Sequence, residues 1–380
     1  MRKLKKIKIS FFIGSMDIGG TERHVLYLIN KLDKKRFDID LHLLYREGKL
    51  IKKVDKQIKT FTPTFSFSSK LKHPLNFLSS YLRIKRTNPD IIHCFLPHAY
   101  LFGGFIGLIQ KKKVVMSRRS LNTYQKNFKF FPIKKIERFL HSKMNLILAN
   151  SRAIEKELRK EGVKKDRLKI VFNGIIPHAN PKNETVSSLH KKLGLTKHFF
   201  IFLVVANLIA YKNHSMIINA VEKLGNDTNK KFKVIFIGSG NKTYEEHIKN
   251  TLSKKNLNKY VTIIKNSAEI YNFFKIADVG ISSSNEEGLS NSILEYLSFG
   301  IPVIATNVGG NPEIINEKNG YLIKKNNHVQ LFKKMKIIME NPKKFRQLSI
   351  QAKLDSQKYS FKKTISEYTS IYKNLMGNGA

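Results

Sequence analysis

Short apolar runs alternate with helical patterns along most of the chain. The first run, residues 7–13, leads into a loop between Gly14 and Gly20, and apolar residues at three- and four-residue spacing follow that loop. A strand, a glycine loop and a helix in this order are typical of the start of a doubly wound α/β domain. Further strands are predicted at residues 39–44, 91–95, 113–116, 146–149 and 169–172. Their alternation with helical stretches predicts a parallel sheet with helices on both faces.

A second series of the same kind begins after Asn173-Gly174 and a polar stretch from Pro177 to Ser188. Its predicted strands are residues 199–205, 234–237, 261–264, 279–281 and 303–305. We therefore expect two α/β domains with a linker near residues 175–195, and the length of 380 residues suits two domains. Residues 360–376 carry an amphipathic stripe, which predicts a terminal helix packed on a domain surface.

The apolar segments are too short for a membrane span. Ala99 to Gln110 is apolar over about 12 residues, fewer than the roughly 20 that cross a bilayer, and is predicted to be a buried helix. The apolar run behind the basic N-terminus stops at Asp17, too early for a signal peptide. Cys94, the single cysteine, excludes a disulfide framework and is expected to be a small buried hydrophobe. A soluble or peripheral protein in a reducing cytoplasm is the prediction.

The net charge of +42 predicts a strongly basic surface. Residues 1–180 hold 40 of the 70 lysine and arginine residues but only 13 of the 28 acidic ones. Such a field attracts anions, which include lipid headgroups, phosphates and nucleic acid. The alternative is a lysine-rich solvated surface that needs no ligand.

The candidate chemistry lies between Ser282 and Glu313. Glu287 precedes a predicted helix and Glu295 lies within it, with Gly288 to Asn291 between them at the helix N-terminus. Free backbone N–H groups at a helix N-terminus bind anions, and carboxylates accept hydrogen bonds from sugar or ribose hydroxyls. The pattern suits a nucleotide diphosphate sugar. The alternative is that Glu287 caps the helix and Glu295 is a solvated surface residue.

The same segment, from Glu287 through Glu295 to Glu313, resembles the signature of the retaining glycosyltransferases of family 4, glycosyl transferases group 1. The resemblance covers nearly the whole chain, with further matches at Gly19–Arg23, Ala149–Ser151, Asn173–Ile175, Ala206–Lys212 and Gly238–Gly240. It implies an α/β GT-B fold of two Rossmann-like doubly wound parallel-sheet domains facing a central cleft. Residues 1–178 would bind the acceptor, with helix 360–380 packed on them, and residues 179–359 would bind the nucleotide sugar.

The resemblance also implies roles for individual residues. Lys212 would neutralise the diphosphate leaving group, Glu287 would contact the transferred sugar and Glu295 the ribose hydroxyls. His98 would lie beside the donor sugar, with a satisfied strand-end histidine as the alternative. The remaining donor-binding residues implied are Gly20, Asn207, Gly238, Gly288, Leu289, Ser290 and Asn291.

Asn207 departs from the family pattern, which usually has an arginine five residues before the lysine. The missing cation leaves more of the diphosphate charge to Lys212. Arg118 and Arg119 either contribute a replacement charge or lie in a solvated loop.

The resemblance implies retention by front-face attack, with Glu287 positioning the sugar. A lysine and helix amides can stabilise the leaving diphosphate, so neither a metal nor a cofactor is expected. The nearest Asp-x-Asp pattern, Asp38-Ile39-Asp40, falls in a predicted strand as ordinary solvated carboxylates.

The expected reaction is transfer from a nucleotide sugar, most commonly a UDP-sugar, to a lipid-linked glycan of a capsule or lipopolysaccharide. The stretch Phe61 to Arg86 combines apolar and basic residues, which suits the inner face of an anionic cytoplasmic membrane. A core helix with a basic outer face is the alternative.

Three rival functions remain at this point. A nucleic-acid-binding protein would explain the charge, but no recognisable binding module is present. Other GT-B enzymes, such as epimerases and inverting transferases, lack the Glu-x7-Glu arrangement. An inactive nucleotide-sugar-binding member would be consistent with Asn207.

Overall fold

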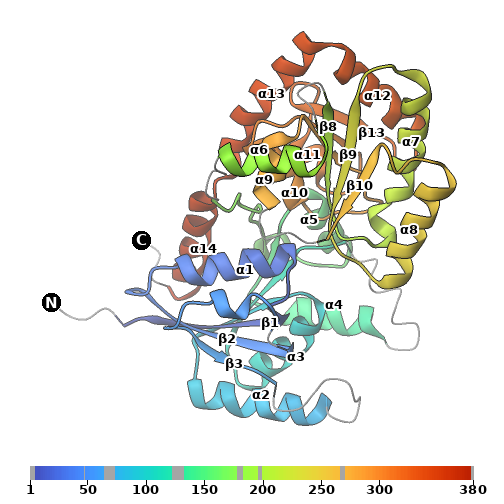
Figure 1. Ribbon diagram of the computed structural model, residues 1–380. Coiled ribbons are helices and arrows are strands. Elements are labelled where there is room, and N and C mark those ends of the chain that lie inside the picture. The colour runs from blue at the N-terminus through green and yellow to red at the C-terminus, as the bar shows by residue number, and fades with distance from the viewer. Residues whose placement is uncertain are drawn as a thin grey trace. The chain divides into compact units, whose positions relative to one another are not determined.

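The computed structural model describes residues 5–46, 48–63, 73–121, 132–177, 183–195, 199–265 and 270–377. The chain divides into two compact units (Figure 1). The N-terminal unit comprises Met1–Ile176 together with Phe361–Ala380, and the C-terminal unit comprises Pro177–Ser360. The boundary predicted from the sequence, between residues 178 and 179, lies close to this division.

The N-terminal unit is built on a parallel sheet of seven strands among the described residues, in the order β3-β2-β1-β4-β5-β6-β7. Its strands alternate with helices along the chain, as the hydrophobic pattern predicts. The strands are β1 (Ile7–Ser15), β2 (Phe37–Arg46), β3 (Lys59–Phe61), β4 (Ile91–Phe95), β5 (Lys113–Arg118), β6 (Leu146–Ala149) and β7 (Leu168–Ile170).

Side chains of β1 alternate between two hydrophobic cores. Ile9 and Phe11 point to the core formed with α1 (Gly20–Lys31) and α14 (Phe361–Leu375). Phe12 points to the opposite core. That core also contains residues of α2 (His73–Thr87), α3 (Pro97–Ile109), α4 (Ile133–Lys143) and α5 (Arg152–Lys160). The sheet is therefore covered on both faces (Figure 1), which requires nearly continuous apolar strands.

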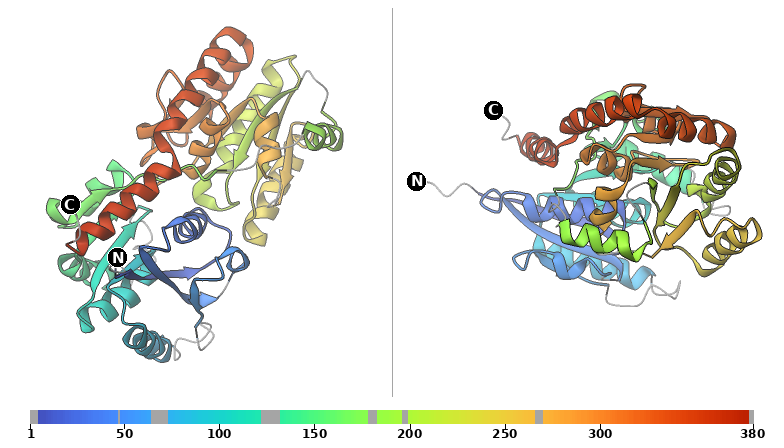
Figure 2. Two further views of the ribbon diagram at one scale, coloured as in Figure 1. Left: turned by 90° about the vertical axis from the view of Figure 1, so that its left-hand side faces the viewer. Right: turned by 45° about the horizontal axis from the view of Figure 1, so that its top comes forward.

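The last helix, α14, belongs to the N-terminal unit although the C-terminal unit precedes it in the chain. Phe361, Tyr368 and Tyr372 of its apolar stripe are buried in the core beneath α1. Both ends of the chain therefore lie in this unit (Figure 2).

The C-terminal unit repeats the architecture with a parallel sheet of six strands among the described residues. Their order is β10-β9-β8-β11-β12-β13, which is the doubly wound order of a dinucleotide-binding fold. The strands are β8 (Phe200–Val205), β9 (Phe232–Ile237), β10 (Val261–Ile264), β11 (Val279–Ser282), β12 (Val303–Thr306) and β13 (Gly320–Ile323).

Helices cover both faces of this sheet as well. One face packs against α7 (His214–Asp227), α8 (Lys242–Lys254), α12 (His328–Glu340) and α13 (Pro342–Ser356). The other carries α9 (Ile270–Ile276) and α10 (Asn291–Ser298) (Figure 1). Short helices α6 (Asn183–Lys192) and α11 (Asn311–Ile314) complete the unit. Tyr296 of α10 bonds through its hydroxyl to Leu203 and Val205, which fixes α10 to β8.

The predicted strands are confirmed, with ends that move by a few residues. Two strands were not predicted, β3 and β13, since one has only three residues and the other begins at a glycine. The predicted linker at residues 175–195 is wrong in part, because α6 occupies Asn183–Lys192.

The apolar segment 97–109 is helix α3 and packs into the core, as predicted. Cys94 is fully buried on β4. Among the described residues, no helix is long and apolar enough to cross a membrane.

Candidate active site

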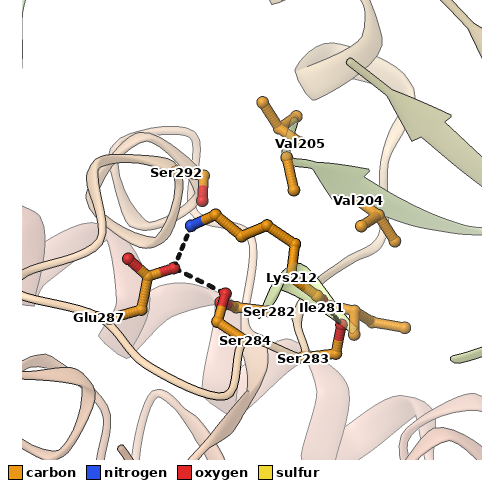
Figure 3. Close-up of a pocket in the computed structure, with 10 residues that line it drawn as sticks. Val204, Val205, Lys212, Ile281, Ser282, Ser283, Ser284, Glu287 and Ser292 are labelled. Carbon is orange, nitrogen blue, oxygen red and sulfur yellow. Dashed lines mark hydrogen bonds and ion pairs between the residues drawn. The ribbon is translucent and has the colours of Figure 1, made fainter. Parts of the chain in front are cut away.

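A pocket in the C-terminal unit lies where β8 and β11 end (Figure 3). The carboxyl ends of the strands are where open parallel sheets bind their ligands. The pocket contains about 210 Å³ of empty space, part of it continuous with solvent. Its polar lining comes from three segments: Lys212 after β8, the serines that end and follow β11, and Glu287 and Ser292 near α10.

Lys212 and Glu287 form an ion pair in this pocket. The Lys212 Nζ lies 2.5 Å from Glu287 Oε1, and the side chains are 17% and 12% exposed. Ser284 donates a second hydrogen bond to the same carboxylate oxygen at 2.7 Å (Figure 3). Burial alone would lower the pKa of Lys212, but the negative charge of Glu287 raises that pKa above its ordinary value. Lys212 is therefore a cation at neutral pH.

Lys212 is held by the loop that follows β11. It ends a short 3₁₀ turn, Ala210–Lys212, and the next residue, Asn213, has left-handed backbone angles. The hydroxyl of Ser283 donates to the Lys212 carbonyl oxygen at 2.6 Å, and the N–H of Asn285 donates to the Tyr211 carbonyl at 2.7 Å. The loop that carries Glu287 thus also positions the lysine.

The loop around Glu287 is supported by the segment after β12. Thr306 donates to the Ser284 carbonyl oxygen at 2.6 Å, and the N–H of Gly310 donates to the Gly288 carbonyl at 2.9 Å. Gly309 has φ +51°, and a Cβ there would lie 1.7 Å from the Glu287 carbonyl oxygen. Gly309 of the predicted signature is therefore needed for close backbone packing behind Glu287.

Helix α10 begins directly after this loop. Its N-cap is Ser290, whose hydroxyl accepts from the Ile293 N–H at 3.4 Å. The alternative that Glu287 caps the helix is therefore wrong. Gly288, Leu289 and Ser290 are buried and Asn291 is half-buried, so the helix N-terminus lies beside the pocket that Ser292 lines.

Glu295 lies on α10 and is half-buried. It is therefore not fully exposed to solvent. Its role with ribose remains a prediction.

The turn after β8 carries Asn207, whose side chain is exposed. Gly238, which follows β9, lies against this turn, and a Cβ on it would lie 1.9 Å from the Ala206 carbonyl oxygen. A residue larger than glycine would displace the turn that leads to Lys212. This steric role explains Gly238, and its contact with a donor remains a prediction.

Two predicted site residues belong to the N-terminal unit. Gly20 is the exposed first residue of α1. His98 is exposed in the first turn of α3, and its ring lies 5.3 Å from that of Tyr45. Leu96, just before this turn, has φ +73°, a strained conformation for a residue with a side chain.

Arg118 and Arg119 do not lie in a solvated loop, because both are buried. Arg118 pairs with Glu161 through two contacts, Nη1 to Oε2 at 3.0 Å and Nη2 to Oε1 at 3.2 Å. That bidentate pair makes Arg118 a structural residue. The partner of Arg119 is a neutral amide, since its Nη2 donates to Asn173 Oδ1 at 2.6 Å.

Asp38 and Asp40 lie in β2, as predicted. The expectation that both are solvated is wrong for Asp40, which accepts from His42 Nε2 at 2.9 Å with 14% of its side chain exposed. Among the described residues, no group of three or more His, Cys, Asp or Glu side chains is placed to hold a metal ion.

Several supporting residues were missed in the sequence. Ser283 and Ser284 directly follow an apolar strand, at the edge where ligands bind, and this position is a signal that could have found them. Asn213 carries no such signal, because its importance comes from its left-handed backbone and its amide contacts with Asn285 and Asn326, at 3.3 and 2.8 Å.

Two Rossmann-like parallel-sheet domains, one with a lysine–glutamate pair beside a helix N-terminus, define a protein of the GT-B class. Two family models match the chain: Glycosyltransferase Family 4 over residues 18–178 and Glycosyl transferases group 1 over residues 185–355. The chain belongs to this glycosyltransferase family.

Relatives and solved structures agree with the assignment. An uncharacterized glycosyltransferase of Haemophilus influenzae is 24% identical, over 96% of this chain and 99% of its own. The UDP-Gal:alpha-D-GlcNAc-diphosphoundecaprenol alpha-1,3-galactosyltransferase of Escherichia coli is 25% identical, over 84% and 85%. The structure of Anabaena HepE in complex with UDP-glucose superimposes with a TM-score of 0.81 at 19% identity, over 96% and 99%.

Proposed function

We propose that the protein is a retaining, metal-independent glycosyltransferase that moves a sugar from a UDP-sugar to a lipid-linked glycan. The observation that carries this proposal is the Lys212–Glu287 pair beside the N-terminus of α10. A cation and a helix N-terminus on one side of a pocket suit a diphosphate, and a carboxylate beside them suits sugar hydroxyls.

The leaving group sets the main demand of the reaction. When the bond between the anomeric carbon and the diphosphate oxygen breaks, negative charge develops on the departing phosphate. Lys212, which is cationic at neutral pH, and the amides at the start of α10 would stabilise that charge without a metal ion. A donor diphosphate would compete with Glu287 for the lysine.

Retention is assigned to front-face attack. The acceptor hydroxyl would bond to the anomeric carbon on the face that the phosphate leaves, and its proton would pass to the departing phosphate oxygen. Glu287 Oε1 already accepts from both Lys212 and Ser284, which weakens it as a nucleophile. We therefore assign Glu287 to positioning the sugar.

The substrates are proposed from the relatives. The name of the Escherichia coli relative gives a UDP-sugar donor and a diphosphoundecaprenol acceptor, and HepE was solved with UDP-glucose. A place in cell-surface polysaccharide assembly, such as that of a capsule or lipopolysaccharide, follows from this comparison.

A surface of the N-terminal unit supports attachment to an anionic membrane. The residues 64–72 of the predicted membrane stretch lie outside the described part of the chain. In the described part, α2 exposes three leucines at helical spacing, Leu75 at 46%, Leu78 at 52% and Leu82 at 54%. On α4, Phe139 is 49% exposed among exposed basic residues, namely Lys134, Lys135, Arg138 and Lys143.

These two helices cover the same face of the sheet with α3 between them (Figure 1). Apolar side chains with basic neighbours are typical of proteins that bind the interface of anionic membranes. We therefore propose peripheral attachment at the cytoplasmic face.

The test is a transfer assay with EDTA present. The purified protein is incubated with a panel of UDP-sugars and a prenyl-diphosphate-linked N-acetylglucosamine, and the product's anomeric configuration is read by NMR. The proposal expects one donor to react with retention. An inverted product would contradict the mechanism, and activity restored only by Mg²⁺ would contradict metal independence.

A second candidate is an inactive member that binds a nucleotide sugar. Asn207, exposed where the family usually has an arginine, favours it because one diphosphate cation is missing. If calorimetry detects donor binding but no nucleoside diphosphate is released and no sugar is transferred, the protein is an inactive nucleotide-sugar-binding member.

A further inference from the structure

The carboxyl edge of the N-terminal sheet holds a buried arginine that forms no ion pair with a carboxylate among the described residues. Arg119 follows β5, and among the described residues no Asp or Glu oxygen lies within the 4.0 Å of an ion pair with it. Its partners are neutral: Asn173, at 2.6 Å, and the hydroxyl of Tyr368. A buried charge without a counterion is costly and is normally paired or bound to a ligand.

Arg118 provides the contrast within the same loop. It is 1% exposed and holds Glu161 in a bidentate pair. Arg119 keeps 8% of its surface exposed and has no such partner. The two adjacent arginines are therefore buried in different ways: Arg118 forms an ion pair, and Arg119 bonds to neutral groups.

Glu22 is the acid that interacts with Arg119, and it forms no ion pair with the guanidinium among the described residues. Burial lowers the pKa of both His24 and His93, and the nearby positive charge of Arg119 lowers them further, so both imidazoles are neutral. Burial also raises the pKa of Glu22, the acid that interacts with Arg119 from the first turn of α1. That carboxylate bonds to its own backbone N–H.

Two buried polar atoms in this cluster also have no hydrogen-bond partner. They are Oδ1 of Asn150, a residue whose amide donates to Asn173 at 3.3 Å, and Nδ1 of His24, whose other nitrogen contacts Tyr368 at 3.3 Å. Both residues are 2% exposed. A buried arginine without an ion pair and an acceptor without a partner, both at the ligand-binding edge of a parallel sheet, together suit a polar anionic ligand.

We propose that Arg119 and Asn150 form a phosphate-binding subsite of the N-terminal unit. The guanidinium would bind phosphate oxygens through its planar fork, and Asn150 Oδ1 would accept from a hydroxyl of the same substrate. The inference rests on the proposed function, which offers two sources of phosphate, the diphosphate of the donor and that of the lipid-linked acceptor.

The test compares Arg119→Met with Arg118→Met. Calorimetric melting gives Tm, and titration calorimetry measures the Kd of two probes, UDP for the donor and farnesyl diphosphate for the acceptor. Arg118→Met should lower Tm because it removes the bidentate guanidinium from the Glu161 carboxylate, whose side chain is only 10% exposed. Arg119→Met should not lower Tm, because the two residues that bond to the guanidinium each retain another hydrogen bond. Asn173 still bonds to Asn150, and Tyr368 still bonds to Ser117.

Binding separates the two sources of phosphate. Arg119→Met should weaken one probe about tenfold or more, as expected for a lost charge-assisted hydrogen bond. Loss of farnesyl diphosphate binding assigns the subsite to the acceptor, and loss of UDP binding assigns it to the donor. Arg119→Lys, which keeps the charge but not the fork, should fold and bind that probe several-fold more weakly than wild type.

Three results would overturn the inference: dissociation constants within twofold of wild type, a fall in Tm as large as that of Arg118→Met, or a wild-type protein that binds neither probe. These measurements need no catalytic turnover. Failure of the transfer assay would refute the proposed function alone, and probe binding that is unchanged in Arg119→Met would refute the subsite alone.

Discussion

At the scale of single residues, the ion pair of Lys212 and Glu287 depends on backbone contacts that their own side chains do not reveal. Ser283 holds the carbonyl of Lys212, and Gly309 allows the chain to pass directly behind Glu287. The signature from Glu287 to Glu313 could be read from the sequence because its residues are close in the chain. The cluster around Arg119 could not, since contacts such as His24–Tyr368 join residues 344 positions apart.

Gly309→Ala tests the packing behind Glu287. The added Cβ would meet the Glu287 carbonyl oxygen at 1.7 Å, so the loop must move and nucleoside diphosphate release should fall about tenfold or more. Gly300→Ala is the matched control, because Gly300 also has a positive φ, +74°, but its nearest contact would be at 3.4 Å. Both variants should lose about 1–2 kcal/mol of stability from backbone strain. Equal activity in the two variants would contradict the packing argument.

Asp278 gives a prediction about pH. Its carboxylate accepts from the Ile201 N–H at 2.7 Å, and burial raises its pKa to about 6 from an ordinary 3.8. Between those two values the unfolded state releases the proton first, so the free energy of unfolding falls as pH rises and is constant above pH 6.

Asp278→Asn removes that ionisation and keeps an acceptor for Ile201. The variant should match wild type near pH 3.5 and be more stable by about 1–3 kcal/mol near pH 7. Urea unfolding at the two pH values measures the difference. A variant less stable than wild type at pH 7 would show that the carboxylate is favoured in the fold.

At the scale of elements, the strands were predictable because each is a buried apolar run, and β4 and β11 have no exposed residue. The exceptions are the short, half-exposed β3 and the helix α6, whose polar sequence is typical of a linker. The packing of α14 follows from its apolar stripe. Its polar contacts could not be predicted, because His93 bonds to Tyr372 through a separation of 279 residues.

Tyr372→Phe tests how α14 is attached. The His93 Nδ1 contacts the Tyr372 hydroxyl at 2.7 Å, and removal of that hydroxyl leaves a buried imidazole nitrogen without a partner. The free energy of unfolding should fall by about 1–3 kcal/mol. Tyr27→Phe is the control, because Tyr27 is half-buried and packs its ring on Phe361 at 4.5 Å, and it should change stability by less than about 0.5 kcal/mol. An equal loss of stability in the two variants would show that the His93–Tyr372 contact does not stabilise the attachment of α14.

The exposed leucines of α2 test the membrane proposal. Leu78→Asp combined with Leu82→Asp should abolish flotation of the protein with anionic phosphatidylglycerol vesicles, while Tm stays unchanged because both side chains are more than half exposed. The control combines Ile350→Asp with Leu354→Asp on α13, where exposure is 56% and 51%. If the control variant loses flotation and the α2 variant keeps it, the proposed surface is wrong.

At the scale of the whole molecule, the first six strands of the N-terminal sheet follow the same order as the six strands of the C-terminal sheet. Lys212 and Arg119 both lie beyond the carboxyl end of a strand, β8 and β5 respectively. The sequence predicts this duplication because the same strand and helix alternation occurs twice. It does not predict the different character of the two edges. At the C-terminal edge Lys212 forms an ion pair with Glu287, whereas at the N-terminal edge Arg119 forms no ion pair among the described residues.

The most direct test of the account is nucleoside diphosphate release from a UDP-sugar with EDTA present. Wild type should release it, and Lys212→Ala and Glu287→Ala should each be slower by about 100-fold or more. Lys255→Ala is the control, since Lys255 forms a comparable 2.5 Å pair with Glu222 outside the pocket, and it should retain full activity. Release by the Lys212 and Glu287 variants at the wild-type rate would contradict the central claim that this pair forms the donor site.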